Sequence, residues 1–261
     1  MKYGFLNLCF DKDLRTVNKT HRDVFKWASE NGFDGVEIYL PTLSELSWLK
    51  IQGVKKALTD YSLKVSQVSH ANPFLSRDET SQRYAKRYYT LAAEIASVLE
   101  APFLRATSGM KLTDVGEALK HAAEGLGDIL DIADDYDLTI TLENHPGIEE
   151  KSSTLASLFQ TLKSPRVKFN FDTVNSMGVH EDPVEVLRRF SNLLVHVHAC
   201  DAYARNVHEK TVIGMGDVPW KGVMEQLKAL RYKGFLSIEY FGDNPQHALI
   251  ESMNNLKHLE V

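Results

Sequence analysis

Four side chains that can bind a metal ion stand at the ends of four separate apolar runs in this 261-residue chain: Glu143, Asp172, His198 and Glu239. Three carboxylates and one imidazole, with no thiolate, suit a hard or borderline divalent ion rather than a structural zinc. We expect one such ion, with Mn²⁺ as the first choice; the ligand types leave Mg²⁺, Co²⁺ and Zn²⁺ open. An ion held this way keeps positions for substrate oxygens and acts as a Lewis acid on a carbonyl.

The two glutamates lie in segments whose side chains alternate between two faces, as in a β-strand. In residues 139–145, the period of two puts Glu143 on one face and Leu142 on the other. Glu239 stands in the same relation to its apolar neighbours in residues 235–240. Taken alone, each glutamate could equally be solvated or paired. Inside a barrel, however, an unpaired carboxylate is costly, and buried charges are paired or bind metal.

Asp172 and the histidines follow the same rule. Residues 167–172 aim Asp172 toward the expected interior, although an isolated aspartate there could also cap the next helix. Residues 194–199 place two histidines on one face. We assign His198, nearer the open end, as the ligand and His196, one layer deeper, as a hydrogen-bonded group behind it. The recurrence of four such residues at one depth favours a metal site over four unrelated structural roles.

Short apolar runs alternate with amphipathic stretches along the whole chain, which is typical of repeated βα units. Ligands at the carboxyl ends of parallel strands, in a chain near the roughly 250 residues of one barrel, predict an α/β fold of the (β/α)8 TIM barrel class, with residues 1–261 as a single domain. The eight expected strands are residues 3–9, 35–40, 64–70, 103–107, 138–144, 167–172, 194–199 and 235–240.

Helical segments are indicated between these strands. Residues 115–133 carry apolar side chains at steps of three and four, as one helix face requires. Asp182 followed by proline, and the hydroxyl residues 152–154, predict capped helix starts. Two later helices should begin near Val218 and Asn244.

The alternative topology is an open doubly wound sheet, but residues 10–14 lack the glycine-rich turn that usually follows its first strand. Residues 201–219 are long and polar, and we interpret them as a loop that could carry function.

Composition narrows the function classes. The formal charge is −5 without a lysine- or arginine-rich block, so we expect no nucleic-acid partner. Cys9 and Cys200 lie outside any CxxC spacing, so neither a disulfide framework nor a thiolate site is supported, and both should be reduced and partly buried. The apolar start, residues 1–10, is too short to span a membrane. We expect a cytoplasmic protein with a small-molecule substrate and no membrane partner; whether it forms a homo-oligomer is open.

The chain resembles the xylose isomerase-like (β/α)8 superfamily, which includes sugar isomerases and epimerases and apurinic-site endonucleases of family 2 type. The resemblance runs over nearly the whole chain and indicates the fold more strongly than the substrate. The matching segments are residues 31–37 (NGFDGVE), 69–73 (SHANP), 142–145 (LENH), 171–175 (FDTVN), 196–198 (HVH), 214–220 (GMGDVPW) and 234–239 (GFLSIE).

This resemblance implies a reaction. In ketose 3-epimerases of the superfamily, the residues that match Glu143, Asp172, His198 and Glu239 hold one divalent ion, which binds two adjacent oxygens of an open-chain sugar. The resemblance therefore implies a proton shuttle, in which one glutamate removes the proton next to the carbonyl and the other returns a proton to a cis-enediolate. It gives these catalytic roles to Glu143 and Glu239.

Five further residues are candidates for substrate binding: His70, His145, Glu149, Asn175 and Arg205. The family's epimerases commonly have histidine where Asn175 stands; asparagine can hydrogen-bond a hydroxyl but cannot carry a proton, so this difference bears on the substrate. Arg205 resembles the family's substrate-binding arginine, with a solvated loop arginine as the alternative. For His70 and His145 the alternative is a structural, hydrogen-bonded histidine.

The leading prediction is a metal-dependent sugar isomerase or epimerase. The closest alternative is a dehydratase of the 3-dehydroshikimate or keto-inositol type, which shares the proton abstraction and then expels a hydroxyl; residues 239–244 also resemble that branch. A binding protein without activity is a third class, and the four retained ligands argue against it. The endonucleases hold three metals and need further histidines, where this chain has Ser108, Gly109 and Asn175.

Overall fold

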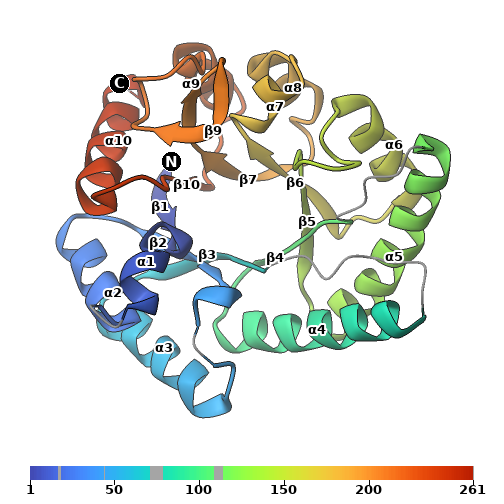
Figure 1. The fold of residues 1–261 in the computed structure, drawn as a ribbon, viewed down its shortest axis with the longest axis horizontal. Coiled ribbons are helices and arrows are strands. Elements are labelled where there is room, and N and C mark those ends of the chain that lie inside the picture. Colours follow the sequence, from blue (N-terminus) through green and yellow to red (C-terminus); the bar gives the residue numbers. More distant parts are fainter. Residues whose placement is uncertain (17–18, 44, 71–78, 109–113, 261) are drawn as a thin grey trace.

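Eight parallel strands close into a barrel surrounded by helices (Figure 1). The computed structural model describes residues 1–16, 19–43, 45–70, 79–108 and 114–260. The predicted (β/α)8 barrel is confirmed. Around the barrel the order is β1-β10-β7-β6-β5-β4-β3-β2. The strands are β1 Lys2–Leu6, β2 Gly35–Tyr39, β3 Lys64–Ser69, β4 Phe103–Ala106, β5 Thr139–Glu143, β6 Val167–Asp172, β7 Leu194–Ala199 and β10 Phe235–Ile238.

All eight expected strands are found, and most differences lie at their ends. The first strand stops at Leu6 because the following residues turn into the short helix η1, Asn7–Phe10. A second such helix, η2, spans Leu40–Thr42. Of the segments that carry the family resemblance, residues 71–73 lie outside the described part of the chain.

Ten α-helices are found among the described residues, and the longer ones form the outer ring (Figure 1). None of them has both the length and the apolar character needed to cross a membrane. They are α1 Asp11–Arg15, α2 His21–Glu30, α3 Trp48–Asp60, α4 Glu79–Val98, α5 Val115–Asp135, α6 Ser152–Leu162, α7 Asn175–Gly178, α8 Pro183–Arg189, α9 Trp220–Ala229 and α10 Pro245–Glu260.

Helix starts agree with the sequence in part. The Asp182 carboxylate caps α8 by accepting the Val184 N–H. The predicted cap at residues 152–154 is wrong, because those residues already lie in the first turn of α6. The Ser152 N–H instead donates to the Glu181 carboxylate from a distant segment, which local sequence does not reveal. The last two helices begin at Trp220 and Pro245, within two residues of the predicted positions.

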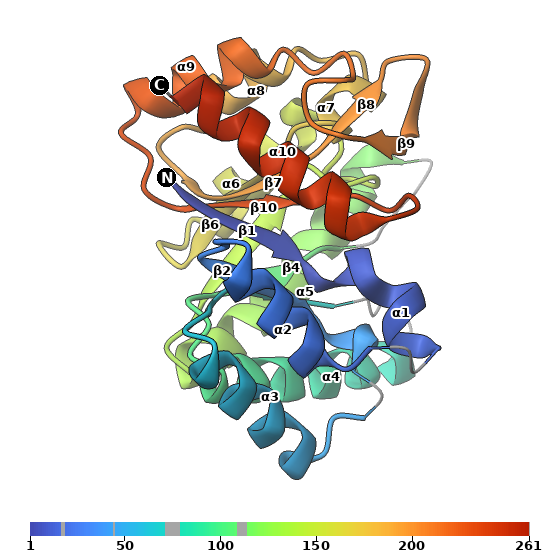
Figure 2. The ribbon, with the colours of Figure 1, turned by 90° about the vertical axis from the view of Figure 1, so that its left-hand side faces the viewer.

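The stretch expected as a long loop contains a two-stranded antiparallel sheet of β8, Asp201–Tyr203, and β9, Asn206–Thr211. Figure 2 shows this hairpin beyond the carboxyl ends of the barrel strands, beside α7. Its shape depends on Asp201, whose carboxylate accepts the backbone N–H groups of Gly214, Gly216 and Val218. A Cβ on Gly216 would lie 2.2 Å from the Asp201 carboxylate, so glycine is required there.

The glycine requirement can be tested directly. We expect Gly216→Ala to displace the Asp201 carboxylate and to lower the free energy of unfolding by about 1–3 kcal/mol through lost hydrogen bonds. The control is Gly53→Ala, at an exposed position inside α3 with open space around it. That change should raise the free energy of unfolding by up to about 1 kcal/mol. Urea denaturation measures both; an unchanged Gly216→Ala midpoint would contradict the packing argument.

Candidate metal and active site

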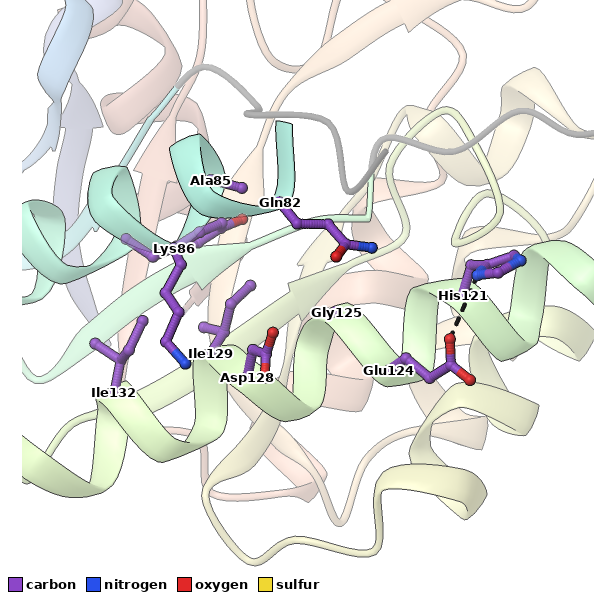
Figure 3. Close-up of a pocket in the computed structure, with 10 residues that line it drawn as sticks. Gln82, Ala85, Lys86, His121, Glu124, Gly125, Asp128, Ile129 and Ile132 are labelled. Carbon is purple, nitrogen blue, oxygen red and sulfur yellow. Dashed lines mark ion pairs between the residues drawn. The ribbon is translucent and has the colours of Figure 1, made fainter. Parts of the chain in front are cut away.

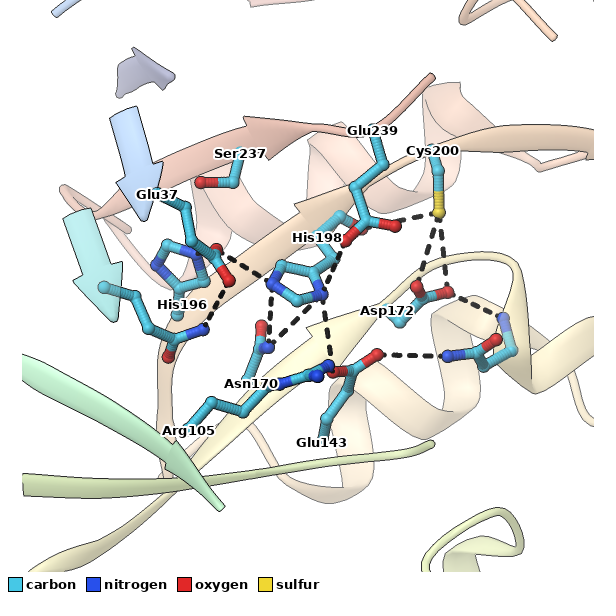
Figure 4. Close-up of polar contacts among 12 residues, drawn as sticks. Glu37, Arg105, Glu143, Asn170, Asp172, His196, His198, Cys200, Ser237 and Glu239 are labelled. Carbon is cyan, nitrogen blue, oxygen red and sulfur yellow. Dashed lines mark hydrogen bonds and ion pairs between the residues drawn. The ribbon is translucent and has the colours of Figure 1, made fainter. Parts of the chain in front are cut away.

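The structure brings the four predicted ligands together at the carboxyl ends of β5, β6, β7 and β10 (Figure 4). All four side chains are buried. His198 lies between the two glutamates: its Nδ1 is 3.0 Å from Glu239 Oε1 and 3.4 Å from Glu143 Oε2. Ligand atoms of Glu143, Asp172 and His198 lie within 4.8 Å of one another, as an ion bound by all three requires.

Asp172 has two roles in this arrangement. Its Oδ1 accepts the backbone N–H groups of Val174 and Asn175, at 2.8 and 2.7 Å, so the carboxylate does organise the turn that follows β6. The Cys200 thiol is 3.5 Å from both carboxylate oxygens. Asp172, Cys200 and Glu239 form a second group with ligand atoms within 4.8 Å, so Asp172 links the two halves of the site.

Glu37 is a central residue to which the sequence analysis gave no role. It enters the barrel from β2, is fully buried, and its Oε2 lies 2.9 Å from Nε2 of both His196 and His198. Because Nε2 of His198 is bound to this carboxylate, its Nδ1 is the nitrogen that faces the other acids. Period-two alternation in β2 places Glu37 on the inner face and would have found it.

Arg105, on β4, is a second residue that was not predicted. Its guanidinium pairs with Glu143 Oε2, and Asn175 Nδ2 donates to Glu143 Oε1 over 3.1 Å. Burial alone raises the pKa of Glu143, but Arg105 and His198 outweigh it and hold that pKa well below its ordinary range. Both carboxylate oxygens of Glu143 are therefore held in place by a polar partner.

Glu239 has a different environment from Glu143. Burial raises its pKa to about 7, with His198 acting in the opposite direction. His198 responds to the surrounding acids: burial alone lowers its pKa, but Glu37, Glu239 and Glu143 raise it well above the ordinary value. The three carboxylates thus stabilise positive charge at the His198 imidazole.

Lys210 reaches the barrel mouth from β9 of the hairpin. Its Nζ is 3.4 Å from Cys200 Sγ. Burial alone lowers the pKa of Lys210, but Cys200, Asp172 and Glu239 raise it by more. The pKa therefore lies above its ordinary value, and the ammonium stays charged. Cys9 and Cys200 are both free and buried, and burial raises the pKa of the Cys200 thiol, so it remains protonated at neutral pH.

A divalent ion fits the charge of this site. Among the described residues, four buried carboxylates, Glu37, Glu143, Asp172 and Glu239, face two cationic side chains, Arg105 and Lys210. Buried charges need compensation, and two negative charges remain when both histidines are neutral, as His198 would be once it gives up its proton to bind an ion. One dication balances them.

The predicted substrate contacts fall into two groups. A cavity of about 250 Å³ at the mouth is lined by Asn175 and His145, together with the acids, Arg105 and Lys210. The other three lie elsewhere. His70 is buried with its ring edge-on to Tyr89, at 4.5 Å between centroids. Glu149 is buried and accepts the Ser108 N–H, and burial raises its pKa. Arg205 lies exposed over the Tyr203 ring in the hairpin.

A separate hollow of about 240 Å³ lies between α4 and α5, on the outside of the barrel (Figure 3). Its charged side chains are Lys86, His121, Glu124 and Asp128, and His121 Nδ1 lies 3.4 Å from Glu124 Oε2. The ligand residues of the mouth do not line it, so the chemistry of the site belongs to the mouth cavity.

Comparisons with known proteins agree with this architecture. An uncharacterized protein of Methanocaldococcus jannaschii is 28% identical over 256 residues, which cover 92% of this chain and 83% of that protein. A 3-dehydroshikimate dehydratase of Bacillus anthracis is 22% identical over 284 aligned positions, covering 100% of this chain and 99% of the enzyme. The crystal structure of a D-tagatose 3-epimerase-like protein superposes with a TM-score of 0.84 at 23% identity, covering 99% of this chain and 97% of that one, and so supports the fold.

Residues 25–259 match the family model described as xylose isomerase-like TIM barrel. The match covers all the ligand-bearing strands and leaves out only the first part of the chain and its last two residues. The chain belongs to the xylose isomerase-like TIM barrel family.

Proposed function

We propose that this protein is a divalent-metal-dependent isomerase or epimerase of ketose-type sugars, which works by proton transfer at a carbon next to a carbonyl. The observation that carries the proposal is the pair of buried carboxylates, Glu143 and Glu239, on either side of His198 Nδ1. Glu143, Asp172, His198 and Glu239 would hold the ion, for which we favour Mn²⁺. The ion would supply positive charge beside the carbonyl oxygen and so acidify the neighbouring C–H.

The two glutamates divide the work according to their contacts. Glu239 Oε1 lies 3.0 Å from His198 Nδ1 and the pKa of Glu239 is raised to about 7, whereas both oxygens of Glu143 are engaged by Arg105 and Asn175. We assign removal of the substrate proton to Glu143, which stays ionised, and delivery of a second proton from the opposite side to Glu239, whose raised pKa lets it hold one near neutral pH. Figure 4 shows the two side chains approaching His198 from β10 and β5. Proton transfer from opposite sides inverts the carbon, which is the outcome of an epimerase.

Lys210 favours a second candidate function, a dehydratase. Its partly buried ammonium lines the mouth cavity and could donate a proton to a departing hydroxyl. The relative from Bacillus anthracis, aligned over this whole chain, is a 3-dehydroshikimate dehydratase. Both functions share the first proton abstraction and differ in what happens to the intermediate.

One experiment can test the shared proton abstraction and also show whether the intermediate is reprotonated or loses water. We expect Mn²⁺-loaded protein in deuterated water to exchange the proton next to the carbonyl of at least one member of a panel of ketoses and keto acids. Mass spectrometry and ultraviolet absorbance then report the product: epimerisation leaves the mass unchanged apart from the deuterium label, while dehydration removes one water and creates a chromophore. Absence of exchange across the panel would count against both functions.

The glutamates are tested by Glu143→Gln and Glu239→Gln. We expect each change to reduce exchange by roughly 10²–10⁴-fold, the range for loss of a general acid or base. The control is Glu225→Gln, at an exposed position on α9, which should exchange at the normal rate. Near-normal exchange in both active-site variants would refute the assigned roles.

Glu37 is expected to position His198 for the ion rather than to touch the substrate. Glu37→Gln removes the negative charge beside Nε2 of His198 and leaves a single acceptor oxygen next to an amide donor, and we expect it to weaken Mn²⁺ binding by about 10–100-fold. Calorimetry on chelator-treated protein measures this, with circular dichroism to verify folding and Glu225→Gln as the matched control. Unchanged Mn²⁺ affinity would show that Glu37 is a packing residue only.

A further inference from the structure

The mouth cavity adjoins a larger hollow. The two share Leu8 and Phe241 in their linings, and the second hollow, of about 870 Å³, lies between η1–α1 and the segment that joins β10 to α10. Small-molecule sites commonly measure about 300–1,000 Å³. The mouth cavity, at about 250 Å³, is below that range on its own, and the hollow beside it, at about 870 Å³, lies within the range.

Phe241 marks the junction of the two spaces. Its side chain is 48% exposed, although Phe is an apolar residue, and it lies three residues past the end of β10. The next residue is Gly242, where a Cβ would lie 2.4 Å from the Tyr240 hydroxyl, so a side chain there would have to displace the Tyr240 ring. An exposed aromatic ring at the entrance of a site offers a flat apolar surface to a ligand ring.

The walls of the hollow are polar and close to neutral. Lys19 Nζ lies 2.7 Å from Asp13 Oδ2 and 3.3 Å from Gln246 Oε1, which joins the two sides. Three carboxylates, of Asp11, Asp13 and Asp243, face two ammonium groups, of Lys12 and Lys19. An anionic group such as phosphate is recognised by an excess of positive charge, which is missing among these described residues. Mixed donors and acceptors around an aromatic ring suit the hydroxyls of a neutral sugar ring.

We propose that this hollow is a subsite for a second, neutral sugar unit, and that the substrate is a glycosylated ketose rather than a free monosaccharide. The inference rests on the proposed function, because it takes the ketose unit to lie at the four acids. The glycosyl unit then stacks on Phe241 and hydrogen-bonds to the walls near Gln246.

Binding measurements test the subsite without requiring turnover. Calorimetry on the Mn²⁺-loaded full chain compares D-fructose, the glucosyl ketose isomaltulose and D-fructose 6-phosphate. We expect isomaltulose to bind about tenfold more tightly than D-fructose, a difference that a single well-placed ring contact can supply. Phe241→Ala and Gln246→Ala should each reduce this ratio, while Leu230→Ala, at a partly exposed position beyond the end of α9, should keep it.

Three results would overturn the subsite: equal binding of isomaltulose and D-fructose to the wild type, a ratio that both subsite variants preserve, or tightest binding of D-fructose 6-phosphate. Deuterium exchange in the same samples separates this inference from the proposed reaction. A preserved binding ratio without exchange for either sugar supports the subsite and refutes the reaction. Exchange with equal binding supports the reaction and refutes the subsite.

Discussion

The compensation of negative charge buried at the barrel mouth is the constraint on which this structure depends. Four carboxylates converge where water is largely excluded, and each would be costly without a partner. The positive charges come from separate parts of the fold, Arg105 from β4 and Lys210 from the hairpin outside the barrel. The proposed dication closes the balance, so ion binding and the packing of the mouth are coupled.

The hairpin of β8 and β9 positions one of these two cations, Lys210, at the barrel mouth. Asp201 lies two residues after the end of β7, and by accepting three backbone N–H groups from the returning segment it fixes the path of the chain between β9 and α9. This path brings Lys210 back over the carboxyl ends of the strands, beside Cys200. A residue 11 positions after the last β7 residue thus becomes part of the site through pairing of β8 with β9.

The barrel strands and the four proposed ligands could be predicted from the sequence, but the hairpin could not. Strand alternation is local, so eight strands and the convergence of Glu143, Asp172, His198 and Glu239 could be predicted from short windows. Glu37 obeys the same alternation but sits within its strand, away from the end where ligands were sought. The hairpin could not be predicted, because β9 is polar and exposed and its register is set by distant backbone contacts. Arg205 was predicted from the family resemblance alone; in the structure it lies over the Tyr203 ring, while Lys210 of the same hairpin lines the mouth cavity.

Buried hydrogen bonds beneath the site fix the position of His198. Thr141 Oγ1 donates to Gln67, Gln67 Nε2 donates to Glu37, and Glu37 in turn binds His198, so the imidazole rests on a chain of buried hydrogen bonds from three other strands. These hydrogen bonds are hard to alter without leaving a buried polar group unpaired, whereas Phe241 lies in the segment after β10 and Gln246 in the first turn of α10. Under the proposed function, the buried hydrogen bonds fix the groups that transfer the proton, while the residues around Phe241 and Gln246 select which carbonyl compound reaches them.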